Sequence, residues 1–298
     1  MTEKENRKDH IPGIFEIQRP VDGVADLPLV FDSPHSGREY PADFNYACSF
    51  EMLRQAEDNQ VDTLIRTAPA HGATVLNALF PRTYIDVNRA ADDIDTELLD
   101  KRWPAPIVPT SRSYSGIGLI RRLVRPGTPV YDRHLSVQEI RNRIEDYYVP
   151  YHTALKHLLD DAHYRFGQVW HINTHSMPST SVPVAFGMAS MQPDFVIGDR
   201  DGTSCNPDFT HFLRDSLKGM GYRVAINHPY KGVEIVRRYA HPAAGRHSIQ
   251  LEIGKALYWD EHRNEPNRNF NNLKADTDKL AGLCADYARS NLIELAAD

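Results

Sequence analysis

Three residues of this chain combine the side-chain types found in hydrolytic metal sites: His35, His175 and Glu252. His175 ends the apolar run 168–174 and stands directly before a turn, so its side chain is expected at the end of a strand. His35 follows the apolar run 27–31 and precedes Ser-Gly, which predicts the same position at another strand end. Two imidazoles and a carboxylate are a common set in zinc hydrolases. The alternative is that each histidine only hydrogen-bonds a neighbouring loop.

Glu252 stands inside the apolar segment 248–253, which we predict to be a strand. Side chains alternate along a strand, so Glu252 shares a face with Gln250 and Ser248. A buried carboxylate without a partner is costly, and we therefore expect a cation, a metal or several hydrogen bonds nearby. Glu252 is then either a structural ion-pair partner or the general base that takes a proton from water and passes it to the leaving nitrogen.

Arginine and asparagine side chains follow the segment 83–87, a further predicted strand. The guanidinium of Arg89 has the planar shape that binds a carboxylate through two hydrogen bonds, and Asn88 adds an amide donor beside it. This pair suits a substrate that carries a carboxylate. The alternative is a surface ion-pair network of Arg89 with Asp86 or Asp92.

The elements that must position these residues follow an α/β pattern. Short apolar runs rich in β-branched residues alternate with longer segments of helical period, which predicts an α/β domain with a largely parallel sheet. Pro150 is expected to kink or split the second helix. The expected helices are 50–67, 136–165, 208–220 and 273–295. The expected strands are 27–31, 74–79, 83–87, 169–173, 182–186, 223–227 and 248–253.

The length of 298 residues suits a single α/β domain, which we place at 16–298 after a flexible leader at 1–15. Five prolines and three glycines between Trp103 and Pro129 predict a long loop. Loops of this length in compact domains often cover functional sites, so we expect this one to be functional.

Composition limits the classes of partner and ligand. The net charge of −6 gives no general attraction to nucleic acid or to an anionic membrane. A charged N-terminus and the lack of an apolar run near the roughly 20 residues of a membrane span predict a soluble cytoplasmic protein. Three widely separated cysteines fit neither a disulfide framework nor a cysteine-rich metal site. Any metal is therefore expected to be held by histidine and carboxylate.

Six short motifs occur in order along the chain: Pro34–Gly37, Asp58 with Asp62, Tyr84–Ala90, Thr174–Ser176, Gly198–Cys205 and Gln250–Glu252. Together they resemble the N-formylglutamate amidohydrolase family, relatives of the zinc carboxypeptidases and of succinylglutamate desuccinylase. The resemblance implies an α/β fold like that of the zinc carboxypeptidases, with a mixed, mainly parallel twisted sheet flanked by helices. It also implies one divalent metal, with Zn²⁺ as the expected ion.

Carried over by position, the resemblance makes His35 and His175 metal ligands and Glu252 the catalytic glutamate. It makes Asn88 and Arg89 the clamp for the α-carboxylate of the substrate.

The third metal ligand departs from the carboxypeptidase pattern. Those enzymes take it from a glutamate three residues after the first histidine, where this chain has Arg38. Asp58, in the matching aspartate motif, is the preferred ligand, and Glu39 is the alternative.

The reaction implied is hydrolysis of the N-formyl amide of N-formyl-L-glutamate to formate and glutamate. Arg82 is the candidate for stabilising the oxyanion that forms on the formyl carbonyl. Because glutamate has two carboxylates, a second cation is expected from Lys231, Arg237 or Arg246. The alternatives are a related deacylase or carboxypeptidase acting on another N-acyl amino acid or short peptide, and a non-enzymatic metal- or ligand-binding protein.

Overall fold

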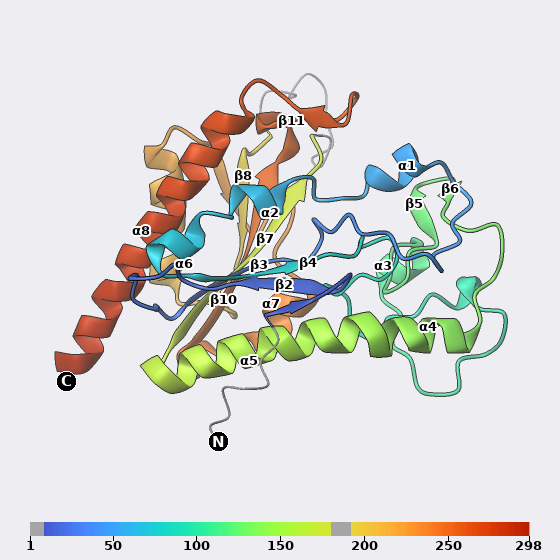
Figure 1. The fold of residues 1–298 in the computed structure, drawn as a ribbon, viewed down its shortest axis with the longest axis horizontal. Coiled ribbons are helices and arrows are strands. Elements are labelled where there is room, and N and C mark those ends of the chain that lie inside the picture. Colours follow the sequence, from blue (N-terminus) through green and yellow to red (C-terminus); the bar gives the residue numbers. More distant parts are fainter. Residues whose placement is uncertain (1–8, 180–191, 298) are drawn as a thin grey trace.

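The computed structural model describes residues 9–179 and 192–297, which fold around an eight-stranded sheet (Figure 1). Neighbouring strands are parallel through the middle of the sheet and at one edge, and antiparallel elsewhere. This confirms the α/β class and the mixed, mainly parallel sheet. In spatial order the strands are β1 (His10–Ile11), β2 (Phe15–Gln18), β4 (Thr74–Ala78), β3 (Leu29–Ser33), β7 (Val169–Met177), β10 (Arg246–Gly254), β8 (Phe195–Gly198) and β9 (Val224–Ile226).

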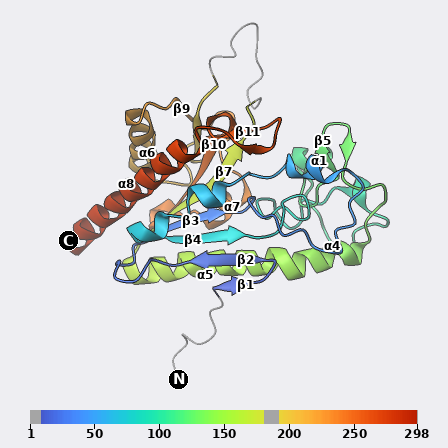
Figure 2. The ribbon, with the colours of Figure 1, turned by 45° about the horizontal axis from the view of Figure 1, so that its top comes forward.

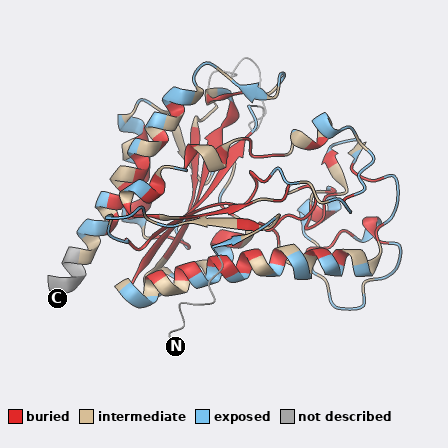
Figure 3. Ribbon diagram, in the orientation of Figure 1, coloured by how far each residue is buried: buried red, intermediate tan, exposed pale blue. Residues whose placement is uncertain are grey.

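Helices cover both faces of the sheet. Helix α5 (Val149–Phe166) packs on one face, and α6 (Pro207–Gly219) and α8 (Phe270–Ala297) pack on the other (Figure 1). Helix α4 (Val137–Arg143) continues in line with α5 beyond the strands (Figure 1). Along β3, Val30 packs toward α5 while its neighbours pack toward α8, as strand alternation requires. Every residue of β3, β7 and β8 is buried, and Figure 3 shows this central burial. Strands covered on both faces read as continuous apolar runs, which is why β3 and β7 were found from the sequence, whereas β8 was not predicted.

The predicted strand 83–87 and part of the predicted leader 1–15 were wrong. Residues 83–87 form turns. The side chains of Ile85 and Val87 are buried in the core, which explains their apolar pattern, but the backbone hydrogen-bonds to a loop and not to a strand. Part of the expected leader joins the sheet, where β1 and β2 extend it antiparallel at the edge seen in Figure 2. The burial of Phe15 against the core explains this order. The expected strand 182–186 lies outside the described residues.

The expected helix 50–67 is two short helices, α1 (Phe50–Arg54) and α2 (Val61–Leu64). The side chain of Ser49 caps α1 by accepting a hydrogen bond from the backbone of Met52. Gln60, which precedes α2, has a left-handed backbone with φ of 57°. The break leaves Asp58 on an irregular segment, with its side chain free to face the sheet.

The expected helix 136–165 is continuous but irregular. Ser136 caps α4 through the backbone N–H of Glu139, as the capping spacing predicts. A π-helical turn, η4 (Ile144–Tyr148), joins α4 to α5 directly before Pro150. Proline lacks a backbone N–H and interrupts the regular helical hydrogen bonds. The π-helical turn is therefore the irregularity that was expected at Pro150.

The loop 103–129 contains helix α3 (Ser111–Tyr114) and a hairpin of β5 (Leu123–Arg125) and β6 (Thr128–Pro129). Helix α7 (Glu234–Tyr239) and the hairpin of β11 (Trp259–Asp260) and β12 (Glu265–Pro266) complete the main elements. No helix within the described ranges has the length and apolarity needed to cross a membrane.

Candidate active site

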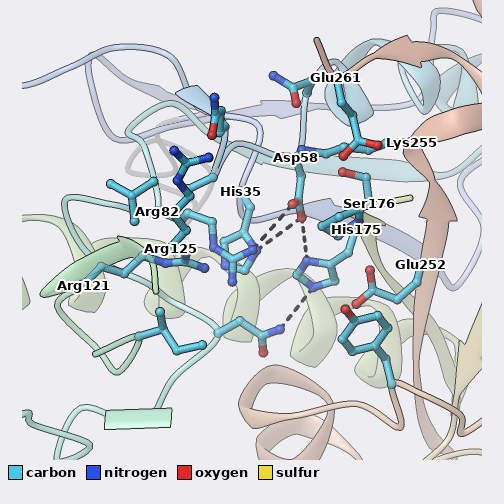
Figure 4. Close-up of a pocket in the computed structure, with 18 of the residues that line it drawn as sticks. His35, Asp58, Arg82, Arg121, Arg125, His175, Ser176, Glu252, Lys255 and Glu261 are labelled. Atoms are coloured by element: carbon cyan, nitrogen blue, oxygen red, sulfur yellow. Dashed lines mark hydrogen bonds and ion pairs between the residues drawn. The ribbon is translucent and has the colours of Figure 1, made fainter. Parts of the chain in front are cut away.

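Three buried side chains from separate elements meet at one end of the central strands (Figure 4). His35 follows β3, His175 stands near the end of β7, and Asp58 comes from the break between α1 and α2. One ligand-type atom of each residue lies within 4.8 Å of the others. The structure thus brings Asp58 to the two histidines. Glu39 is exposed and does not belong to this group.

The geometry of the group suits a metal ion. Asp58 Oδ2 lies 3.0 Å from His175 Nδ1 and 3.4 Å from His35 Nδ1. His35 Nδ1 is buried and has no hydrogen-bond partner among the described residues. An unsatisfied buried nitrogen is costly, and a cation between the two Nδ1 atoms and the carboxylate would satisfy it. The donor set of two nitrogens and one oxygen matches that of catalytic zinc sites, which keep an open position.

The remaining ring nitrogens are held by residues that sequence reasoning did not single out as site residues. His35 Nε2 donates to Asp86 Oδ1 at 2.7 Å, and His175 Nε2 donates to Asn173 Oδ1 at 2.7 Å. Asn173 is itself oriented by donating from Nδ2 to Asp32 Oδ1 at 2.8 Å. A ring that donates from Nε2 in this way carries no proton on Nδ1 and can ligate a metal there.

Asp58 is held by contacts to its own segment and its neighbours. Its backbone N–H donates to His35 O at 3.0 Å, and Ser36 Oγ donates to Asp58 O at 2.9 Å. Lys255, which directly follows β10, donates from Nζ to Glu57 O at 2.6 Å. The burial of Lys255 lowers the pKa of its ammonium. The segment carrying Asp58 is therefore fixed from both sides.

Glu252 lies beside His175, because β7 and β10 pair in parallel with these two residues in register. Gln250 Nε2 donates to Glu252 Oε1 at 2.8 Å. Burial raises the pKa of Glu252 to about 7. A carboxyl with such a pKa can accept and release a proton near neutral pH, which is the requirement for a general base.

Arg82 joins the carboxylates around His35. Its Nη2 donates to Asp86 Oδ2 at 2.8 Å, and its Nη1 lies 3.5 Å from Asp58 Oδ1. Despite burial, the neighbouring histidines and Arg82 hold the pKa of both carboxyls well below its usual range. Both therefore stay anionic, as a metal ligand and its supporting partner require.

Asn88 and Arg89 line the same cavity, but each is partly engaged by the protein. Asn88 Oδ1 accepts from the backbone N–H of Ile235 at 2.9 Å, and its Nδ2 lies 3.1 Å from His175 Nε2. Arg89 donates to the backbone carbonyls of Ile117 and Asn88. Arg89 is buried, so the surface network considered for it is wrong.

The structure places the three expected second cations outside the cavity. Lys231 pairs with Asp201 and Arg237 pairs with Glu234, both on the exposed surface. Arg246 starts β10, at the far end of the strand from Glu252, and pairs with Asp160. None of these three is among the described residues that line the cavity.

The cavity has a volume of about 590 Å³ and a cationic lining. Its cations outnumber its carboxylates, which are Asp58, Glu252 and Glu261. Three of the five arginines that line the cavity come from the loop 103–129, where the sequence has no periodic pattern that could have identified them. The cationic lining residues are Arg82, Arg89, Arg112, Arg121, Arg125 and Lys255.

Comparisons with known proteins agree with this geometry. The chain is 30% identical over 246 residues to an N-formylglutamate deformylase of Pseudomonas putida, with 79% of this chain and 83% of that protein covered. A crystal structure of N-formylglutamate amidohydrolase from Ralstonia eutropha JMP134 has 44% identity and a TM-score of 0.87, covering 94% of this chain and 99% of that one. A gene product of Agrobacterium tumefaciens shares the fold, with 16% identity, a TM-score of 0.63 and 96% of both chains covered. Residues 27–259 match the model of the N-formylglutamate amidohydrolase family, and the chain belongs to this family.

Proposed function

We propose that this protein is a metal-dependent amidohydrolase that cleaves the N-formyl amide of N-formyl-L-glutamate to formate and glutamate. The observation that carries the proposal is the buried group of His35, Asp58 and His175 beside Glu252, within a cationic cavity. Family membership and the names of the relatives support the same reaction.

His35 Nδ1, His175 Nδ1 and a carboxylate oxygen of Asp58 would hold one divalent metal, for which we propose Zn²⁺. When bound, such an ion acts as a Lewis acid and lowers the pKa of a coordinated water toward about 7. Asp86 and Asn173 keep the two rings oriented by accepting from Nε2.

Glu252 is the proposed general base. Its carboxylate takes a proton from the attacking water and delivers it to the amide nitrogen as that bond breaks. Glu252 stands next to His175 on the neighbouring strand and so lies beside the metal ligands. Within the described residues its carboxylate makes no hydrogen bond to the ring of His35 or His175. Arg82, on the His35 side, is proposed to stabilise the oxyanion of the formyl carbonyl.

Arg89 is proposed to bind the α-carboxylate of the substrate. Its Nε and Nη1 are fixed by backbone carbonyls, so the guanidinium is already oriented when the substrate arrives. Asn88 beside it is held by Ile235, which limits the movement of this wall. Preorganised groups of this kind bind with a smaller loss of conformational entropy.

The test is metal analysis of the purified protein together with a formate-release assay on N-formyl-L-glutamate. We expect about one zinc per chain and turnover that is lost on chelation and restored by added zinc. The panel also includes N-acetyl- and N-succinyl-L-glutamate and a dipeptide ending in glutamate. Preferential release of another acyl group, or of a peptide residue, would assign a related deacylase or carboxypeptidase. Metal binding without hydrolysis of any of these compounds would indicate a non-enzymatic metal-binding protein.

A further inference from the structure

Arg121 is a buried cation of the active-site cavity whose guanidinium donates no hydrogen bond within the described residues. Its side chain is 10% exposed, and its Nε is buried without a hydrogen-bond partner within the described part of the chain. Its recorded ion-pair contact is with Asp86 Oδ2, at 4.0 Å, and that oxygen already accepts two hydrogen bonds from Arg82. Burial and the neighbouring arginines lower the pKa of Arg121 to about 9.

The buried Arg143 shows how this protein treats an arginine that serves the fold. Arg143 donates to the backbone carbonyl of Tyr84, to Tyr131 Oη and to Glu139, and its guanidinium lies over the ring of Tyr84. Nε is unpartnered in both arginines, but within the described residues Arg121 donates no side-chain hydrogen bond, and its carboxylate contact is the 4.0 Å pair with Asp86. A buried charge of this kind is costly unless a ligand completes it.

The loop around Arg121 is built to hold its position. Leu119 accepts from Asp86 N at 2.8 Å through its carbonyl and donates to Asp93 O at 3.0 Å. Gly118 packs so tightly that a Cβ would stand 2.9 Å from Asp93 O. The guanidinium is therefore presented by a fixed loop, on the same side of His35 as Arg82 in Figure 4.

The excess of positive charge in the cavity favours a ligand with more than one negative group. Its cationic side chains outnumber its carboxylates by six to three before any metal is added. The proposed substrate has two carboxylates, and Arg89 accounts for only one. The surface cations first considered for the other are outside the cavity.

We propose that Arg121 binds the side-chain carboxylate of the acidic amino acid and so makes this enzyme selective for glutamate over neutral N-formyl amino acids. This inference rests on the proposed function, because it assigns the second carboxylate of that substrate. The planar guanidinium can donate two parallel hydrogen bonds to the side-chain carboxylate of the substrate. The neutral amide of a glutamine substrate cannot accept both of these bonds.

The experiment compares kcat/KM for three substrates. N-formyl-L-glutamine lacks the side-chain carboxylate, and N-formyl-L-isoglutamine lacks the α-carboxylate. In the wild type we expect glutamate to be preferred over both. Arg121→Gln should lower kcat/KM for N-formyl-L-glutamate about 10- to 100-fold, leave N-formyl-L-glutamine nearly unchanged, and keep the preference over isoglutamine. Arg121→Lys should restore only part of the lost selectivity.

Arg122→Gln is the matched control, because Arg122 is the neighbouring residue but pairs with Asp95 and Glu97 away from the cavity. It should leave the selectivity unchanged. Thermal melting and metal content establish that each variant is folded and loaded. A glutamate-to-glutamine preference that survives in Arg121→Gln, or is absent in the wild type, overturns the inference. Loss of the preference over isoglutamine instead would also overturn it, because Arg121 would then serve the α-carboxylate.

Calorimetric titration with L-glutamate and L-glutamine measures the same preference without hydrolysis. A wild-type preference for glutamate that disappears in Arg121→Gln supports the inference even if no formate is released. In that case the proposed function fails and the carboxylate assignment stands. If formate is released but the preference for glutamate does not depend on Arg121, the proposed function stands and the carboxylate assignment fails.

Discussion

At the residue scale, the site depends on which nitrogen of each histidine faces Asp58. The two Nδ1 atoms face the carboxylate, while Asp86 and Asn173 take the two Nε2 atoms. We expect His35→Ala and His175→Ala each to remove the metal and the hydrolytic activity together, because each loses one of three ligands. Metal content and formate release measured on the same preparations check this. A double variant that retains full metal occupancy would contradict the assignment.

Glu252→Gln separates proton transfer from metal binding. The amide preserves the shape but cannot accept a proton, so turnover is expected to fall by about 10² to 10⁴-fold while the metal stays bound. Near-normal turnover would return Glu252 to a structural role.

The pKa of Glu252 also predicts a pH dependence. A general base works only when deprotonated, so kcat/KM should rise with pH through the pKa of this carboxyl. Burial raises that pKa to about 7, and a cation held by the adjacent ligands lowers it, so the acid limb is expected at or below about pH 7. A pH profile of the wild type measures this limb. An acid limb well above pH 7 would exclude Glu252 as its origin.

At the element scale, the end of β3 and its approach to the residues after β4 set the position of His35. A Cβ on Gly37 would stand 2.2 Å from Phe80 O, a backbone atom that cannot move aside cheaply. Gly37→Ala should therefore destabilise the protein by about 1–3 kcal/mol or more and weaken metal binding, since it displaces the turn after His35. Thermal melting and metal titration measure both. Gly219→Ala, where a Cβ meets open space at the end of α6, is the control and should lower neither stability nor metal binding.

The sequence predicted the elements whose burial leaves a periodic or apolar signal. The strands carrying His175 and Glu252 were found because apolar runs end at turns, and their parallel neighbours follow from the α/β pattern. The break that frees Asp58 was missed, since residues 55–60 contain neither proline nor glycine to mark the left-handed backbone of Gln60. Arg121 had no signal at all, because an irregular loop positions it.

Partners of the histidines were only partly visible in the sequence. Asn173 stands two residues before His175, so strand alternation puts both on one face, and this spacing could have identified it. Asp86 belonged to a recognisable motif, but the predicted strand 83–87 hid that it faces His35. The surface cations were chosen by charge alone, and charge does not report which way a side chain points.

At the scale of the whole molecule, the metal should contribute to stability, because its three ligands come from parts of the chain far apart in sequence. A ligand that binds only the folded state stabilises it by about 2.7 kcal/mol at a free concentration 100 times its dissociation constant. Chelation should thus lower the melting temperature by several degrees, and zinc should restore it. In His35→Ala, chelation should have little effect; an equal shift there would place the stabilising ion elsewhere.

The cationic cavity belongs to a protein with a net charge of −6. A concave, low-dielectric wall concentrates the electric field, so the opening attracts anions from solution although the rest of the surface repels them. Capture of a dianion is then faster than diffusion alone would give, and salt weakens this attraction beyond about 8–10 Å. Encounter with an uncharged analogue gains nothing from the field. The enzyme would therefore begin to discriminate between acidic and neutral molecules during their approach, before any arginine touches a carboxylate.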